Sequence, residues 1–109
     1  MPSSTLELNA PAVHSVSVGR LKSTFELVDG RSVSAPLDWF PRLKAGTLQE
    51  RKNWELIGAG FGVHWPDLDE DIHVESLLLG KKSLESERSF QAWLARRPKK
   101  KLNGEMRTG

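Results

Sequence analysis

The feature that most constrains the fold of this chain is a pair of alternating apolar patterns that meet at Asp29-Gly30. In the run from Leu21 to Leu27, Phe25 and Leu27 alternate with Thr24 and Glu26, as the side chains of half-buried strands do. In the run after the turn, Val33, Ala35 and Leu37 alternate in the same way with Ser32, Ser34 and Pro36. An Asp-Gly pair between such runs is a strong hairpin signal. A similar run over 13–18 ends at Gly19-Arg20, which favours a second tight turn. The N-terminal half is therefore predicted to form antiparallel strands joined by hairpins.

The second half of the chain predicts short elements separated by glycine and proline. Pro41 favours a brief helical turn. Thr47 and Glu50 have the spacing of a capping box, which predicts a helix over 48–53. The remaining patterns predict strands over 55–57 and 61–65 and an acidic loop over 67–71. They also predict a helix over 72–79, closed by Gly80 as a left-handed cap, and a helix over 83–96 whose apolar stripe is Leu84, Phe90, Trp93 and Leu94. The fold class is thus α+β, with a small antiparallel sheet of about five short strands packed with two or three short helices.

Length and charge predict one domain followed by a basic tail. A chain of 109 residues suits one hydrophobic core and is short for two. We expect a flexible lead-in over 1–12 and a single domain over 13–97. Residues 1–95 hold ten Lys and Arg against thirteen Asp and Glu, whereas the last fourteen residues hold six against Glu105 alone. Residues 98–109 are therefore predicted to form a flexible basic tail.

Several classes of protein and site are disfavoured by the residues present. The chain has no cysteine, which excludes disulfides and thiolate chemistry and favours a cytoplasmic protein. No apolar run is long enough to span a membrane, and none has the pattern of a signal peptide. Asp67, Asp69 and Asp71 resemble the start of a calcium loop, but Ile72 stands where that loop needs glycine.

No catalytic, cofactor-binding or metal-binding residues are predicted. His14, His64 and His73 lack the spacing of a zinc site, and no serine lies in a Gly-x-Ser-x-Gly turn. His64 is the one histidine expected to pair with a nearby carboxylate and titrate near neutrality. An enzyme with a site around His64 and residues 67–71 is the least supported of the functional hypotheses.

Four segments of the chain resemble a known bacterial family. They are Asp29-Gly30-Arg31, Pro36-Leu37-Asp38-Trp39-Phe40-Pro41-Arg42-Leu43, Glu50-Arg51-Lys52-Asn53-Trp54 and Gly62-Val63-His64-Trp65-Pro66-Asp67-Leu68-Asp69-Glu70-Asp71-Ile72. In this order they resemble the family called domain of unknown function 2442, over about Val13 to Gly80. The resemblance implies a small α+β domain without established catalytic residues. It also implies a gene often adjacent to that of a second small protein, as in toxin–antitoxin pairs.

These observations favour a non-enzymatic protein-interaction module, the antitoxin-like half of a two-protein pair, whose partner is a small protein encoded nearby. The candidate interaction surface comprises Trp39, Phe40, Arg42, His64, Trp65, Asp67, Asp69, Glu70 and Asp71. Packing would require the same residue types, and the favoured interpretation of Trp39 and Trp65 by themselves is that they fill the core between sheet and helices. A homodimer through a strand edge at Pro36 is a further form of association. The alternative function is nucleic-acid binding or regulation by a tail comprising Arg96, Arg97, Lys99, Lys100 and Lys101. Some family members carry a helix-turn-helix domain, but the chain after Gly80 is too short for one.

Overall fold

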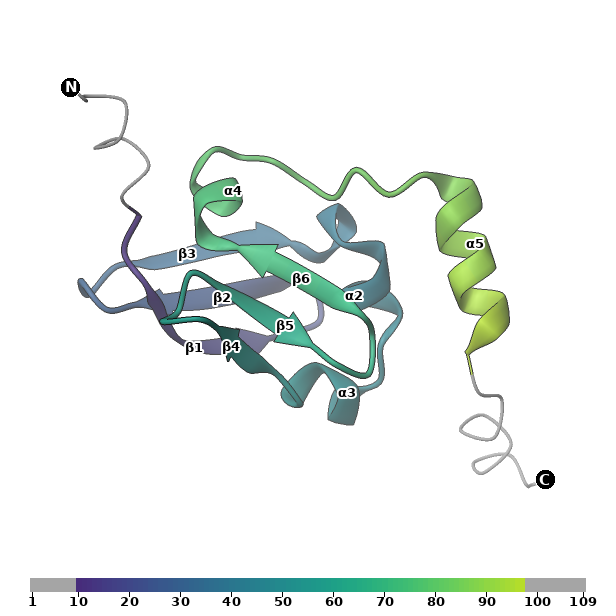
Figure 1. The fold of residues 1–109 in the computed structure, drawn as a ribbon, viewed down its shortest axis with the longest axis horizontal. Coiled ribbons are helices and arrows are strands. Elements are labelled where there is room, and N and C mark those ends of the chain that lie inside the picture. Colours follow the sequence, from purple (N-terminus) through teal and green to yellow (C-terminus); the bar gives the residue numbers. More distant parts are fainter. Residues whose placement is uncertain (1–9, 98–109) are drawn as a thin grey trace.

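The first sheet is an antiparallel meander near the N-terminal end of the chain (Figure 1). The computed structural model of the protein describes residues 10–97. The strands, in the order β1-β2-β3, are β1 (Val13–Val18), β2 (Lys22–Leu27) and β3 (Ser32–Pro36). Gly30 adopts a φ of 97° in the turn between β2 and β3, which confirms the predicted Asp-Gly hairpin.

The second sheet has three antiparallel strands in the order β4-β5-β6. They are β4 (Glu55–Ile57), β5 (Gly62–Trp65) and β6 (Glu70–His73). The α+β class and the short antiparallel strands are confirmed, and the described strands form two sheets of three in place of one sheet of about five. The sequence predicts a loop over 67–71 and a helix from residue 72. In the structure, Glu70–His73 instead pairs with Gly62–Trp65 as a strand. Pairing with β5 outweighs the weak strand propensity of Glu70 and Asp71.

In the part of the chain that the structure describes, five short helical segments connect and flank the sheets. They are the 3₁₀ turn η1 (Leu37–Trp39) and the helices α2 (Pro41–Ala45), α3 (Leu48–Lys52), α4 (Val74–Leu78) and α5 (Glu87–Arg96). The capping box before α3 is present as predicted, because the Thr47 hydroxyl accepts from the Glu50 amide and Glu50 reaches back. Gly80, with a φ of 73°, follows α4 as the predicted left-handed cap.

The two C-terminal helices are shorter than predicted. Residue 72 belongs to β6, so α4 begins only at Val74. The Ser86 hydroxyl accepts from the Ser89 amide and fixes the start of α5 at Glu87. Leu84, which was predicted to lie on the apolar stripe of this helix, is instead in the preceding linker and 97% exposed.

The two sheets pack face to face around one core. Phe25 of β2 and Trp65 of β5 meet edge to face, with ring centroids 6.4 Å apart. The buried apolar residues come from both sheets and from the helices: Val13, Phe25, Leu27, Ala35, Leu37, Phe40, Leu43, Val63, Trp65, Leu68, Ile72, Val74, Leu77 and Trp93. Ala10, in the predicted lead-in, packs against this core. The rest of that lead-in up to residue 9 and the predicted tail over 98–109 lie outside the described residues.

Helix α5 lies at one end of the molecule, reached by the long linker that follows α4 (Figure 1). Trp93, only 6% exposed, anchors α5 to the core cluster. The guanidinium carbons of Arg42 and Arg97 lie 5.1 and 4.9 Å from the Trp93 ring centroid. Arg97 also forms an ion pair with the buried Glu50. Within residues 10–97, no helix is long and apolar enough to cross a membrane.

Candidate functional site

The acidic edge, defined here as Asp67, Asp69, Glu70 and Asp71, follows β5 and continues into β6. Between these strands Leu68 is fully buried, and its amide donates to the Trp65 carbonyl at 3.1 Å. Asp69 adopts a φ of 53°, a left-handed conformation that Asp tolerates better than most residues. The buried leucine therefore anchors the loop while the neighbouring Asp67 and Asp69 are exposed to solvent.

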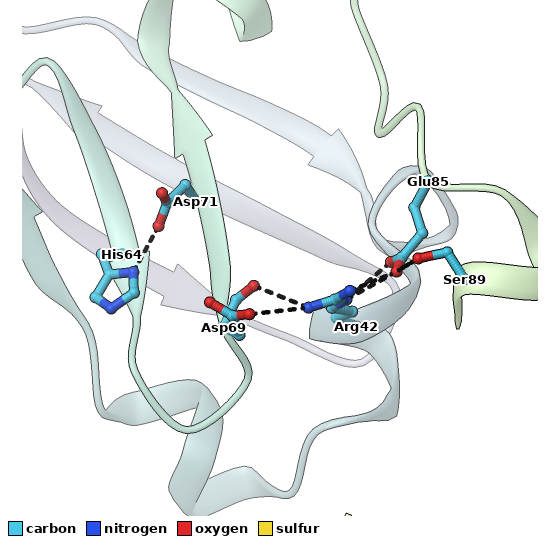
Figure 2. A network of polar contacts seen from close by, with 6 residues as sticks. All are labelled: Arg42, His64, Asp69, Asp71, Glu85 and Ser89. Carbon is cyan, nitrogen blue, oxygen red and sulfur yellow. Dashed lines mark hydrogen bonds and ion pairs between the residues drawn. The ribbon is translucent and has the colours of Figure 1, made fainter. Parts of the chain in front are cut away.

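Arg42 of α2 holds this loop and the start of α5 together (Figure 2). Its Nε and Nη2 atoms donate to the Glu85 carboxylate, with the shortest distance 2.6 Å. Its Nη1 donates to the Asp69 carbonyl at 3.2 Å. The Ser89 hydroxyl donates to the same Glu85 carboxylate at 2.8 Å. Because both partners of the Arg42–Glu85 pair are mostly buried, this contact fixes the shape of the acidic edge.

The electrostatics of this clamp favour its charged form. Hydrogen bonds from Arg42 lower the pKa of Glu85, and the bond to Glu85 raises the pKa of Arg42. Arg42 is thus committed to Glu85 and Asp69, with its side chain only 15% exposed. Its role at this surface is positional, because its guanidinium donors already have acceptors.

His64 and Asp71 lie on the outer face of the second sheet. The strand register places Glu55, His64 and Asp71 opposite one another across β4, β5 and β6. His64 Nδ1 and Asp71 Oδ1 are 2.5 Å apart, as Figure 2 shows. This hydrogen bond is the main reason that the pKa of His64 is raised above its ordinary 6.5, and the nearby Glu55 adds to the effect.

The His64–Asp71 pair should make stability depend on pH near neutrality. A histidine whose pKa is raised by folding stabilises the protein below its unfolded pKa, and that contribution disappears as pH rises through the folded pKa. We therefore expect the contribution of this pair to the free energy of unfolding to fall between about pH 6 and pH 8 by less than about 1 kcal/mol, since the pair is half-exposed. Glu70, whose pKa is raised to about 7, lowers stability over the same range, so the contribution of the pair is the difference between the wild type and Asp71→Asn. Urea denaturation at several pH values measures this slope. The slope should flatten in Asp71→Asn, and an unchanged slope would contradict the assignment.

Glu70 is the most perturbed carboxyl group of the site. It lies on the inner face of β6, in register with the buried Trp65. Burial raises its pKa to about 7, although Arg42 opposes the shift. Within residues 10–97 its carboxylate accepts no hydrogen bond, unlike Asp71 and Glu85. Glu70 is therefore a partly buried acid that lacks a direct donor.

The predicted surface residues do not all reach the surface. Phe40 is 4% exposed and Trp65 is fully buried, because both side chains pack in the core between the sheets and helices. The Trp65 indole also donates to the Arg51 carbonyl at 3.0 Å. Phe40 and Trp65 are therefore not part of the exposed surface. Trp39 is half-buried. Figure 2 shows that Asp69 of the acidic edge contacts Arg42 and that Asp71 contacts His64.

The predicted basic tail is only partly described. Arg96 is exposed at the last turn of α5. Arg97 donates to both carboxylate oxygens of Glu50 and is therefore engaged in the body of the protein. Lys99, Lys100 and Lys101 lie outside the described residues.

For two residues, Glu85 and Leu84, the local sequence did not indicate where the side chain lies. Glu85 contacts Arg42 across 43 positions of sequence, and its own neighbours form no motif. Leu84 was assigned to a buried helix face. For Glu50 the capping box revealed the local role, but nothing local pointed to Arg97. Over the described part of the chain, no group of three His, Cys, Asp or Glu residues is arranged to hold a metal ion.

Comparisons with known proteins identify related sequences and folds. A family described as "Protein of unknown function (DUF2442)" matches residues 15–83. An uncharacterized protein from Chromobacterium violaceum shares the fold with a TM-score of 0.62 and 23% identity, covering 87% of this chain and 84% of that one. A protein of unknown function from Rhodospirillum rubrum has a TM-score of 0.61 and 23% identity, covering 71% of this chain and 95% of that one. No curated protein matches this chain.

Proposed function

Since the chain belongs to the DUF2442 family of proteins of unknown function, we propose its function from the site: it is a non-enzymatic protein-interaction module. The observation that carries the proposal is the acidic edge, where exposed carboxylates are fixed in place by Leu68 and Arg42. A fixed array of like charges attracts an oppositely charged partner and orients it.

Exposed apolar side chains lie near this charged surface. Leu84 lines the same grooves as Glu70 and Asp71, and it is 97% exposed. Leu78 and Leu79, at the end of α4, are 41% and 61% exposed, but they do not line these grooves. Apolar side chains beside a polar rim are typical of protein interfaces. The combination supports docking of a protein better than the binding of a small ion.

The finer form of the proposal concerns the partner. The chain is proposed to be the antitoxin-like half of a bacterial, cytoplasmic two-protein pair, with a small partner encoded by the adjacent gene. Support comes from the family resemblance and from the acidic body, which suits a basic partner.

Neutralising the acidic edge should weaken this association. We expect Asp67→Asn/Asp69→Asn/Asp71→Asn to raise the dissociation constant of the adjacent gene product by about tenfold or more, mainly through slower association. Asparagine suits position 69 because it tolerates the left-handed conformation. Co-purification followed by surface plasmon resonance at two salt concentrations measures the effect.

The matched control neutralises three carboxylates elsewhere, Glu26→Gln/Asp29→Asn/Asp38→Asn, and changes the net charge equally. If the two variants bind alike, net charge alone drives association and the acidic edge is not the docking surface. If the wild-type protein and the adjacent gene product do not associate at micromolar concentrations, the pairing is wrong.

Nucleic-acid binding by the tail is the second candidate, and it rests on the concentration of basic residues at the end of the chain. If the tail binds nucleic acid, the affinity of the protein for an oligonucleotide should fall steeply as the salt concentration rises. The variant Lys99→Gln/Lys100→Gln/Lys101→Gln should lose this affinity. Arg97 is left unchanged in this test because Glu50 already engages it.

A further inference from the structure

A groove runs between β6 and the linker that follows α4. Its volume is about 650 Å³, and its two walls are formed by residues 70–73 and 80–84. A second groove of about 590 Å³ continues from it past Arg42 to the start of α5. Both grooves are lined by Glu70, Asp71 and Leu84. Together they follow one side of a strand.

Among the described strands, one edge of β6 is unpaired. In the sheet order β4-β5-β6, β6 pairs there with β5 alone. The amide of Val74 donates to the Phe61 carbonyl, and hydrogen bonding alternates along an antiparallel pair. The backbone groups of Asp71 and His73 therefore face away from β5. Within residues 10–97, no backbone hydrogen bond joins this edge to the linker across the groove.

The side chains beside this edge define what could bind there. Glu70 and Ile72 share the inner face of β6, two residues apart. The Glu70 carboxylate accepts no hydrogen bond within the described residues, and burial raises its pKa, so an incoming cation would relieve its desolvation. Leu84 offers an exposed apolar contact from the linker. The edge thus presents an acidic position followed by an apolar one.

We propose that β6 binds an extended segment of a partner protein as an added strand, with a Lys or Arg beside Glu70 and an apolar residue two positions away beside Ile72 and Leu84. This inference rests on the proposed interaction function and specifies its site. The backbone groups of Asp71 and His73 would form the main-chain hydrogen bonds to the partner segment. The side chains of Glu70, Ile72 and Leu84 would determine which residues that segment carries.

The charges on the wall of the groove opposite β6 indicate which kind of segment could bind there. Lys81 and Lys82 line the groove across from β6. They would repel a run of consecutive lysines, so an isolated cation is favoured over a polybasic segment such as residues 99–101. This argues for a partner protein and against the chain's own tail.

A synthetic peptide tests the proposal on the full chain. The probe is a fluorescein-labelled Thr-Lys-Thr-Val-Thr-Lys-Thr, in which lysine lies two positions from valine in either direction of binding. Two N-methylated forms carry the methyl groups either on the threonines or on the lysines and valine. Fluorescence anisotropy should show binding of the unmodified peptide. One methylated form should lose at least about tenfold in affinity and the other should keep it, because only alternate amides of an added strand face β6.

Two variants of the protein locate the binding edge. Glu70→Gln should weaken peptide binding by about tenfold. His73→Pro should abolish it, because proline removes an outward amide and its ring enters the groove. The matched control is Leu56→Pro, which removes an outward amide from β4 at the opposite edge of the same sheet. Circular dichroism confirms that each variant is folded, and the control should bind the peptide as the wild type does.

Each other outcome would overturn the inference. Absence of peptide binding at millimolar concentration, or equal loss with both methylated forms, would exclude an added strand. Much tighter peptide binding after Lys99→Glu/Lys100→Glu/Lys101→Glu would identify the chain's own tail as the occupant. Dimerisation abolished by His73→Pro would identify a second copy. If the adjacent gene product binds His73→Pro as tightly as the wild type, the interaction function stands and the β6 site is wrong.

Discussion

Replacing Trp65 with alanine is expected to lower the free energy of unfolding by about 4 kcal/mol. The side chain is fully buried, and its ring meets Phe25 of the other sheet edge to face. Its indole nitrogen also donates to the Arg51 carbonyl in α3. The substitution would therefore leave a cavity between the sheets and remove the donor to a partly buried carbonyl.

Urea denaturation followed by far-ultraviolet circular dichroism measures this loss. Trp65→Phe should cost about 2 kcal/mol, because it keeps much of the apolar volume and loses the hydrogen bond. Leu84→Ala, at a position 97% exposed, is the control and should change stability by less than about 0.5 kcal/mol. Equal effects at positions 65 and 84 would contradict the placement of Trp65 in the core.

The local patterns of the sequence predicted the parts of the fold that local physics determines. Asp29-Gly30 marks a hairpin whatever surrounds it, because glycine permits the positive φ that the turn needs. The capping box of Thr47 and Glu50 likewise depends on four consecutive residues. Such features need no knowledge of distant contacts.

Strand β6 was missed because its stability is not local. Glu70 and Asp71 have weak strand propensity and are common before helices, where they stabilise the N-terminus. The strand forms because Gly62–Trp65 offers it a ladder and Ile72 is buried. The core position that the sequence favours for Trp65 is confirmed, and its alternation with His64 puts it on the inner face. Its place in a distinctive segment is the reason that it was also a candidate surface residue.

The candidate site likewise contains one contact that the local sequence predicts and one that it does not. The proximity of His64 to a carboxylate was predictable from the acidic segment that follows it, and Asp71 is that carboxylate. The Arg42–Glu85 contact was not predictable, because 43 positions separate the residues. Helix α5 and its linker bring them together, and no pattern within either segment specifies that approach.

The second large effect is expected at the ion pair between Glu50 and Arg97. The Glu50 side chain is 4% exposed, and its carboxylate accepts from Arg97 at 2.9 Å and from the Thr47 amide at 2.8 Å. Glu50→Ala should lower the free energy of unfolding by about 3 kcal/mol, because it removes the cap of α3 and the partner of a mostly buried guanidinium. Arg97→Ala should cost about as much, since it removes two hydrogen bonds to a buried carboxylate and uncovers Trp93.

A double-mutant cycle separates the ion pair from these other losses. If the two side chains act through each other, Glu50→Ala/Arg97→Ala should be more stable than the sum of the single losses indicates, by about 1 to 3 kcal/mol. Arg96→Ala is the matched control, because Arg96 is the exposed neighbour and should change stability by less than about 0.5 kcal/mol. Additive single effects would show that Arg97 stabilises the protein through Trp93 alone. A coupling of the expected size would mean that Arg97 is part of the folded body, so the basic segment available to an anionic partner begins only after it.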